Sequence, residues 1–216
     1  MCSSDLNLNV KMSCTMDHHA MISDNHSKFD NMKAWVKTQK NYFSSCNLLL
    51  LHRELKDHIV SAYFQSSERL KNVNKSLPEY IRSDNFGLEN IIKYNLFWKE
   101  DVDVKSRYVF TYEELKYNTI EKIKESAKFC GYTLSDDMLS SSIDHFSFDK
   151  MKQRETEKSD NKNWYYRTDI NNPESFKARR GIIGGYVDYL TQEDIEYCDD
   201  LAEKYDYHNR MQLGNK

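Results

Sequence analysis

The sequence predicts an α/β fold with a central parallel sheet that helices cover on both faces. Two observations lead to this prediction. The run Asn47–His52 (NLLLLH) is apolar without alternation, which is typical of a strand buried on both faces. Residues 54–71 follow directly with apolar side chains at near-helical spacing, so a strand, a tight turn and a long helix come in succession. In sheets of this kind, ligands bind at the carboxyl ends of the strands.

Other segments continue the alternation of strands and helices. Alternating apolar residues predict a strand over 6–14, and a shorter strand is predicted over 108–112. Helices are predicted around 32–43 and over 86–98. Capping residues mark the later helices: Asn118 opens one that ends at Gly131, Ser135 opens the next, and Thr191 opens a terminal helix to about residue 205.

The composition predicts one domain over residues 1–216. Apolar residues make up 39% of the chain and charged residues 30%, which is typical of a packed globular protein. The net charge of −3 leaves no global basic field, so nucleic acid is not an expected partner. Because no apolar run approaches the roughly 20 residues of a membrane helix, no membrane span is expected. The five cysteines lack C-x-x-C spacing, which favours a reducing, cytoplasmic location.

The first chemical motif lies where the strand 47–52 ends. Arg53 follows the strand, and Ser61 lies two helical turns later, so both can reach the same edge of the sheet. A guanidinium fork and a hydroxyl suit a phosphate monoester. The alternative is a surface ion pair between Arg53 and Asp57, with Ser61 merely tolerated in the helix.

Three further motifs follow along the chain. Tyr112 comes at the end of the strand 108–112, where an aromatic ring can pack against an adenine. The third motif is S-F-x-x-M, preceded by one more aromatic residue. The fourth places two cations and a backbone amide in one loop, which could contact a phosphate or be a basic surface loop beside a glycine hinge. The residues concerned are Phe146, Ser147, Phe148 and Met151 in the third motif, and Arg179, Arg180 and Gly181 in the fourth.

Together these motifs resemble the sulfotransferase family. R-x-x-x-D-x-x-x-S, Y-E-[DE]-[LM], S-F-x-x-M and R-[KR]-G-x-x-G occur in the family's order and at about its spacing, over roughly residues 45–205. The resemblance implies a three-layer fold similar to that of P-loop NTPases. It also implies that 3′-phosphoadenosine 5′-phosphosulfate is the co-substrate and that no metal is needed.

The resemblance assigns roles to ten residues. It implies that Arg53 and Ser61 bind the 3′-phosphate and that Arg179, Arg180 and Gly181 close over it from the other side. Arg180 stands where lysine is usual and keeps the charge. Tyr112, Phe148 and Met151 would surround the adenine, with Phe146 and Ser147 on the same loop.

The family's loop for the 5′-phosphosulfate, similar to P-K-S-G-T-T-W, has no counterpart here. Residues 1–46 contain no glycine. We therefore expect an N-terminally truncated sulfotransferase domain: a mis-started gene model, a natural fragment or a degenerate copy. Residues 47–206 would be the nucleotide-binding remainder, and residues 1–46 would hold the candidate base.

The candidate base lies after the predicted strand 6–14. By resemblance, His18 is the first choice and His19 the second; another register puts Met16 in the position of the base. Asp17 and His26 with these two histidines could also hold a metal, and solvated loop histidines are the third alternative.

The sequence thus predicts a sulfotransferase that transfers a sulfuryl group to a hydroxyl or amine acceptor. The alternative is a non-catalytic remnant that binds adenosine 3′,5′-bisphosphate or a protein partner. A nucleotide kinase is disfavoured because G-x-x-x-x-G-K-[ST] is absent from the sequence. The acceptor would be a small molecule or a glycan, and a homodimer is left open.

Overall fold

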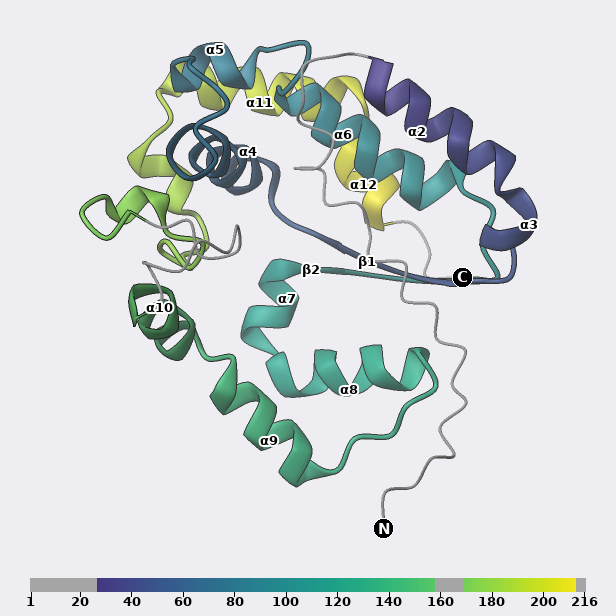
Figure 1. Ribbon diagram of the computed structural model, residues 1–216. Coiled ribbons are helices and arrows are strands. Elements are labelled where there is room, and N and C mark those ends of the chain that lie inside the picture. Colours follow the sequence, from purple (N-terminus) through teal and green to yellow (C-terminus); the bar gives the residue numbers. More distant parts are fainter. Residues whose placement is uncertain (1–26, 158–168, 213–216) are drawn as a thin grey trace.

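The computed structural model describes residues 27–157 and 169–212. Two strands in this part form a parallel sheet: β1 (Asn47–His52) pairs with β2 (Ser106–Thr111), with Asn47 opposite Ser106 and His52 opposite Thr111. Helices lie on both sides of the sheet (Figure 1). The predicted α/β fold with a parallel sheet is therefore confirmed, while the predicted strand 6–14 lies outside the described residues.

The first helical layer lies above the sheet in Figure 1 and contains most of the core. Ile59 of α4, Leu88 and Ile92 of α6 and Tyr207 of α12 are almost completely buried there. Its elements are α2 (Ser27–Thr38), α3 (Lys40–Phe43), α4 (Leu55–Phe64), the π-helical turn η1 (Gln65–Arg69), α5 (Leu77–Ile81), α6 (Leu88–Leu96), the π-helical turn η2 (Phe97–Asp101), α11 (Gln192–Lys204) and α12 (Tyr207–Gln212).

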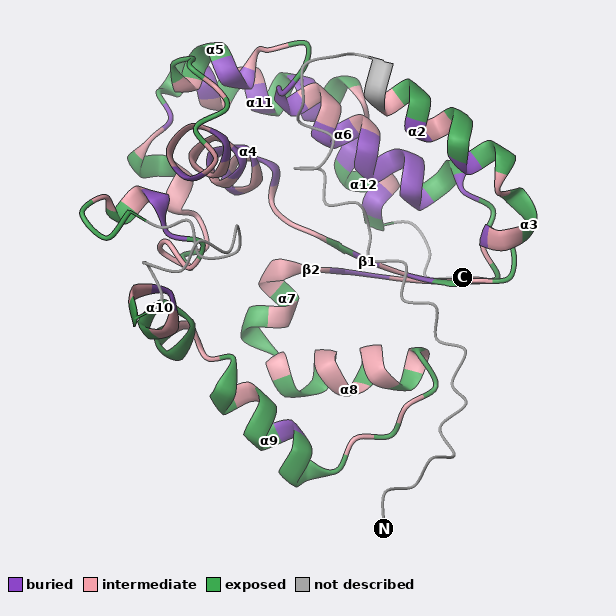
Figure 2. Ribbon diagram, viewed as in Figure 1, coloured by how far each residue is buried: buried purple, intermediate pink, exposed green. Residues whose placement is uncertain are grey.

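The layer on the other side of the sheet is more thinly packed. It consists of α7 (Tyr112–Tyr117), α8 (Thr119–Phe129) and α9 (Asp136–His145), after which α10 (Phe148–Glu157) follows. In Figure 2 these helices are mainly exposed or intermediate, and α7 and α8 bury no residue completely. The short turns η4 (Pro173–Ser175) and η5 (Gly185–Asp188) then lead back to α11.

This asymmetry corrects the prediction that β1 is buried on both faces. Leu48 and Leu50 face the first layer and are buried, but Leu51 on the opposite face is 45% exposed. The reason is that the helices on that side cover the strand incompletely. A run of leucines is compatible with a strand that helices cover on both faces. Whether helices do cover both faces depends on other segments of the chain.

The structure confirms most of the predicted helix-capping residues and corrects one. Ser135 and Thr191 accept backbone hydrogen bonds as helix caps, and Gly131 adopts the left-handed conformation (φ 86°) after α8. Asn118 precedes α8 as predicted, but its side chain makes no capping hydrogen bond. Asn118 lies between α7 and α8, with a backbone of φ −127° and ψ 47°.

Two buried carboxylates hold the loop 177–186, which precedes α11. Asp57 of α4 accepts hydrogen bonds from the backbone N–H groups of Gly184 (2.7 Å) and Tyr186 (3.0 Å). Glu155 of α10 accepts from the N–H groups of Lys177 (2.6 Å) and Ala178 (3.0 Å). Glu155 also pairs with Arg69 of η1 at 2.8 Å, where both side chains are buried. The loop 177–186 is thus tied to the first layer and to α10.

Asp57 provides a test of this anchoring. In Asp57→Asn one of the two backbone N–H groups loses its acceptor, so we expect the free energy of unfolding to fall by about 1–3 kcal/mol. Urea denaturation measures the change, and hydrogen exchange should quicken at Gly184 and Tyr186. The control is Asp200→Asn, at an exposed position of α11, which should change the stability by less than about 0.5 kcal/mol.

A second test concerns His52 at the end of β1. Its ring lies 6.3 Å from that of Tyr207, its Nδ1 is buried without a hydrogen-bond partner in the described part of the chain, and burial lowers the pKa of His52 from 6.5 to about 4. Between these two values the unfolded chain binds a proton that the folded chain does not. Stability should therefore fall as the pH decreases from 6.5 to 4, by up to roughly 3 kcal/mol.

Comparing denaturation midpoints of wild type and His52→Gln across this pH range measures the contribution of His52. The acid-dependent loss should shrink in His52→Gln and persist in a variant of the exposed His208 (His208→Gln). Equal pH profiles for wild type and His52→Gln would contradict the assignment.

Candidate functional site

The carboxyl ends of β1 and β2 place the first two motifs side by side. Because the strands are parallel and in register, Arg53 and Tyr112 leave the sheet at the same edge. The Arg53 guanidinium carbon lies 4.7 Å from the centroid of the Tyr112 ring. Residues 59 positions apart in the chain thus form a cation–π pair at the ligand-binding edge of the sheet.

A cavity of about 630 Å³ opens at this edge. Residues of all four motifs line it. Of the ten residues predicted to bind the co-substrate, all but Ser147 are among them: Arg53, Ser61, Tyr112, Phe146, Phe148, Met151, Arg179, Arg180 and Gly181. Ser147 instead directly precedes α10, where its carbonyl oxygen accepts the first helical hydrogen bond, from the N–H of Met151. The structure therefore brings together segments that lie up to about 130 residues apart.

Arg53 is held firmly in the cavity wall. Its Nη2 donates to the carbonyl oxygen of Ile182 (2.9 Å) and lies 3.3 Å from a carboxylate oxygen of Asp57. The ion pair between Arg53 and Asp57 that the sequence suggests therefore exists. Asp57 is buried, however, and its carboxylate also accepts a hydrogen bond from the N–H of Gly184. The Nε of Arg53 is buried and has no hydrogen-bond partner among the described residues. An unsatisfied buried donor on a cavity wall favours an anionic ligand.

One wall of the cavity is apolar and comes partly from α10. Phe148 and Met151 lie one turn apart on this helix, and Tyr112 begins α7. Gly181 packs on Phe148 so closely that a Cβ atom there would lie 2.8 Å from the ring, and its φ of 61° also favours glycine. Such a wall suits the faces of an aromatic base.

The charge of the cavity is positive. Five cationic side chains line it: Arg53, Arg154, Lys177, Arg179 and Arg180. The carboxylates among the lining residues are those of Asp57 and Glu155, and both already accept backbone hydrogen bonds. An excess of positive charge beside an apolar wall suits a ligand that combines a base with several phosphate charges.

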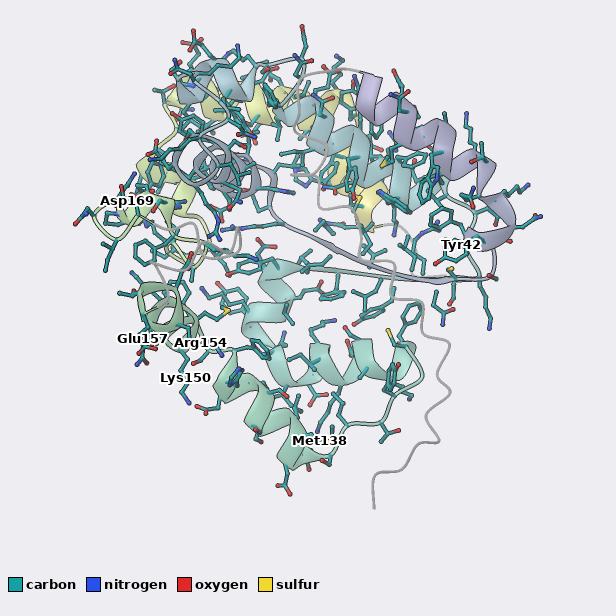
Figure 3. The ribbon with its side chains drawn as sticks, in the orientation of Figure 1. Tyr42, Met138, Lys150, Arg154, Glu157 and Asp169 are labelled. Carbon is teal, nitrogen blue, oxygen red and sulfur yellow. The ribbon has the colours of Figure 1, made fainter. Side chains whose placement is uncertain are left out.

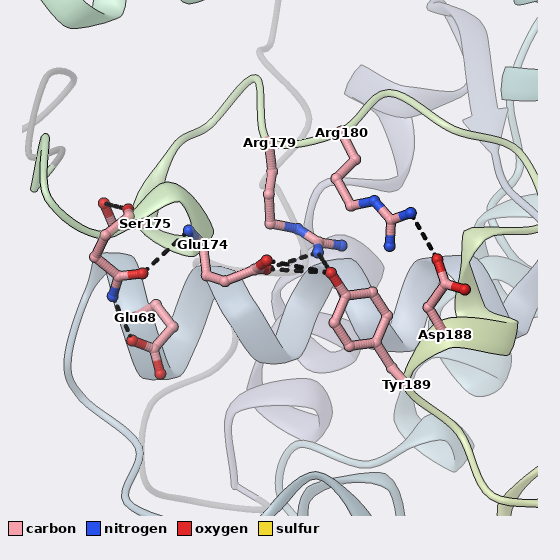
Figure 4. A network of polar contacts seen from close by, with 8 residues as sticks. Glu68, Glu174, Ser175, Arg179, Arg180, Asp188 and Tyr189 are labelled. Atoms are coloured by element: carbon pink, nitrogen blue, oxygen red, sulfur yellow. Dashed lines mark hydrogen bonds and ion pairs between the residues drawn. The ribbon is translucent and has the colours of Figure 1, made fainter.

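The twin arginines of the fourth motif have neighbouring acids (Figure 4). The Nη1 of Arg179 donates to Glu174 (2.7 Å) and to the hydroxyl of Tyr189 (2.6 Å), and its guanidinium lies 4.2 Å from the Phe64 ring centroid. The Nη2 of Arg180 donates to Asp188 at 2.6 Å, and this hydrogen bond raises the pKa of Arg180. Both arginines are thus held in defined positions.

Arg154 is a cavity residue that the sequence interpretation missed. It projects from α10, at the side of the molecule where Lys150 and Glu157 also lie (Figure 3). Its guanidinium donates to the carbonyl oxygen of His145 (2.6 Å) and pairs with no carboxylate in the described part of the chain. The signal was present, because Arg154 follows Met151 by three residues. Recognising it requires a helix over 148–157, and no helix is predicted for these residues from the sequence.

Other candidate residues lie outside the described part of the chain. These are the proposed bases His18 and His19, the alternative Met16, and the metal-binding candidates Asp17 and His26. Within residues 27–157 and 169–212 there is no cluster of three or more histidine, cysteine or acidic side chains that could hold a metal. None of the helices formed by these residues has both the length and the apolar character needed to cross a membrane.

Curated proteins similar to this chain are sulfotransferases. Sulfotransferase 1B1 of Mus musculus is 27% identical over 168 residues, covering 74% of this chain and 54% of the relative. A flavonol sulfotransferase-like protein of Flaveria bidentis is 25% identical over 182 residues, with the same two coverages. The chain thus spans about half the length of the curated relatives that it matches.

Solved structures share the fold. Mouse sulfotransferase SULT7A1, solved in complex with PAP, superposes with a TM-score of 0.57 at 17% identity, covering 88% of this chain and 71% of that one. Retinol dehydratase, solved with androsterone and inactive cofactor PAP, gives a TM-score of 0.52 at 17% identity, covering 74% and 47%. A family model described as the sulfotransferase domain matches residues 7–212, and the chain therefore belongs to the sulfotransferase domain family.

Proposed function

We propose that this chain is the nucleotide-binding part of a sulfotransferase that uses 3′-phosphoadenosine 5′-phosphosulfate as its donor. The observation that carries the proposal is the shared cavity: Arg53 and the twin arginines Arg179 and Arg180 line one space together with an apolar wall. Two similar proteins of known structure were solved with PAP, which supports a ligand of this class.

The residues present fit the adenosine bisphosphate part of such a donor. The unsatisfied Nε of Arg53, the hydroxyl of Ser61 and the arginines of the fourth motif would bind the 3′-phosphate. Tyr112, Phe148 and Met151 would contact the adenine. Because Gly181 has no side chain, the loop that carries the twin arginines can pack directly against the ring of Phe148, which would contact the adenine.

When bound, the donor would supply a sulfuryl group for in-line transfer to an acceptor oxygen or nitrogen. The protein's contribution would be to position the donor and to neutralise its charge. A base is needed to take the acceptor's proton, and His18, followed by His19, remains the prediction for this role. Flavonol sulfotransferases are among the similar proteins, and we propose a small-molecule acceptor by analogy, with a glycan as the alternative.

A second candidate function is non-catalytic binding of adenosine 3′,5′-bisphosphate. The cavity residues account for binding of the bisphosphate, which is all that this function requires. The two candidates share the bisphosphate site and differ in turnover.

Arg53 tests the shared site. Wild-type protein should bind adenosine 3′,5′-bisphosphate more tightly than adenosine 5′-monophosphate in titration calorimetry. Arg53→Ala should weaken bisphosphate binding about ten- to hundredfold and leave the monophosphate nearly unaffected, because a charged hydrogen bond contributes about 1.5–3 kcal/mol. Arg210→Ala on α12 removes an ion pair with Glu100 of η2, and this variant is the matched control that should change neither affinity. A wild type without preference for the bisphosphate would overturn the proposal.

Turnover separates the two candidates. An enzyme should release adenosine 3′,5′-bisphosphate from the donor when phenols or amines are supplied, and His18→Ala should slow this release at least about a hundredfold, the usual contribution of a general base. Tight bisphosphate binding without any release would favour the non-catalytic function, and an undiminished rate in His18→Ala would remove this residue as the base.

A further inference from the structure

The twin arginines share one aromatic ring. The guanidinium carbons of Arg179 and Arg180 lie 5.0 Å and 5.4 Å from the centroid of the Tyr189 ring. In Figure 4 the two side chains descend from the same loop and end side by side. Two like charges held close together repel each other, and an anion that contacts both relieves the repulsion.

A carboxylate flanks each arginine on its outer side. Figure 4 shows Glu174 beside Arg179 and Asp188 beside Arg180, with both guanidinium groups between the two acids. The arginines line the cavity, whereas Glu174, Asp188 and Tyr189 do not. The hydrogen bonds of Arg179 to other described residues use Nη1, so Nε and Nη2 retain donors for a ligand. The acids thus hold the arginines from outside and leave the cavity side open.

The acid beside Arg179 is itself fixed. Asn172 accepts a hydrogen bond from the N–H of Glu174 (3.1 Å) at the start of η4 and donates one to Glu68 of η1 (2.8 Å). The hydroxyl of Tyr189 lies 3.2 Å from a carboxylate oxygen of Glu174, and the Tyr189 ring packs on Phe64 at 4.9 Å between centroids. The two residues that bond Arg179, Glu174 and Tyr189, are therefore themselves held by contacts with the first helical layer.

We propose that Tyr189, Glu174 and Asp188 are positioning residues that hold Arg179 and Arg180 ready to bind one phosphate dianion. This inference rests on the proposed function, since the dianion is the 3′-phosphate of the nucleotide. A long, flexible side chain normally loses rotamer freedom when it binds a ligand, and this loss costs binding free energy. Hydrogen bonds that order the side chain before the ligand arrives reduce that cost. The opposite role, in which Glu174 competes with the phosphate for Arg179, predicts an effect of opposite sign.

Tyr189→Phe is the main test, because it removes the hydroxyl and keeps both the ring and the net charge. Calorimetry should show adenosine 3′,5′-bisphosphate binding about two- to tenfold more weakly, with the affinity for adenosine 5′-monophosphate unchanged. A general loss of structure would weaken both ligands equally. Tyr205→Phe is the matched control: its hydroxyl also bonds a glutamate, Glu89, but the ion pairs of Glu89 are with Lys93 and Lys204, which do not line the cavity. Both affinities should therefore stay at the wild-type values.

Glu174→Gln is the second variant and should also weaken bisphosphate binding selectively. Tighter binding in Glu174→Gln would overturn the inference in favour of competition, and unchanged selectivity in Tyr189→Phe would overturn it as well. These outcomes are distinct from a failure of the proposed function, in which the wild-type protein itself does not prefer the bisphosphate.

Discussion

The buried carboxylate of Asp57 is the constraint on which the site depends. It lies on the first turn of α4, pairs with Arg53 and accepts hydrogen bonds from the backbone of Gly184 and Tyr186. A carboxylate removed from water needs such partners, since an uncompensated buried charge is strongly destabilising. These hydrogen bonds and this ion pair hold the loop of the twin arginines at the edge of the sheet where Arg53 lies.

Much of this arrangement was predictable because it is local. The strand 47–52 was predicted with its observed bounds, and Ser135 and Thr191 cap helices as their residue types indicate. The motif residues also gather at the predicted edge of the sheet, because parallel strands bring their carboxyl ends to one side. Periodicity and capping chemistry act over a few residues, so they can be read from one sequence.

The features that escaped prediction depend on distant partners. The exposure of Leu51 depends on how much α7 and α8 cover, and the pair between Arg69 and Glu155 joins residues 86 positions apart. Arg154 was missed because α10 was not predicted, and Glu174 carries no local pattern that marks it as a partner of Arg179. Pairings of this kind are decided by the packing of the whole chain, which a motif search does not address.

The uneven packing of the two layers bears on how the cavity forms. Arg53 and Ser61 come from the well-packed layer, whereas Tyr112, Phe148 and Met151 come from the thinly packed side, where α7 and α8 bury no residue fully. Segments with few buried contacts open at a lower free energy than the rest of a protein. A molecule bound between the layers adds contacts to both, so occupancy and local folding are thermodynamically linked. A bound nucleotide would then supply buried contacts that the layer of α7 and α8 does not make on its own.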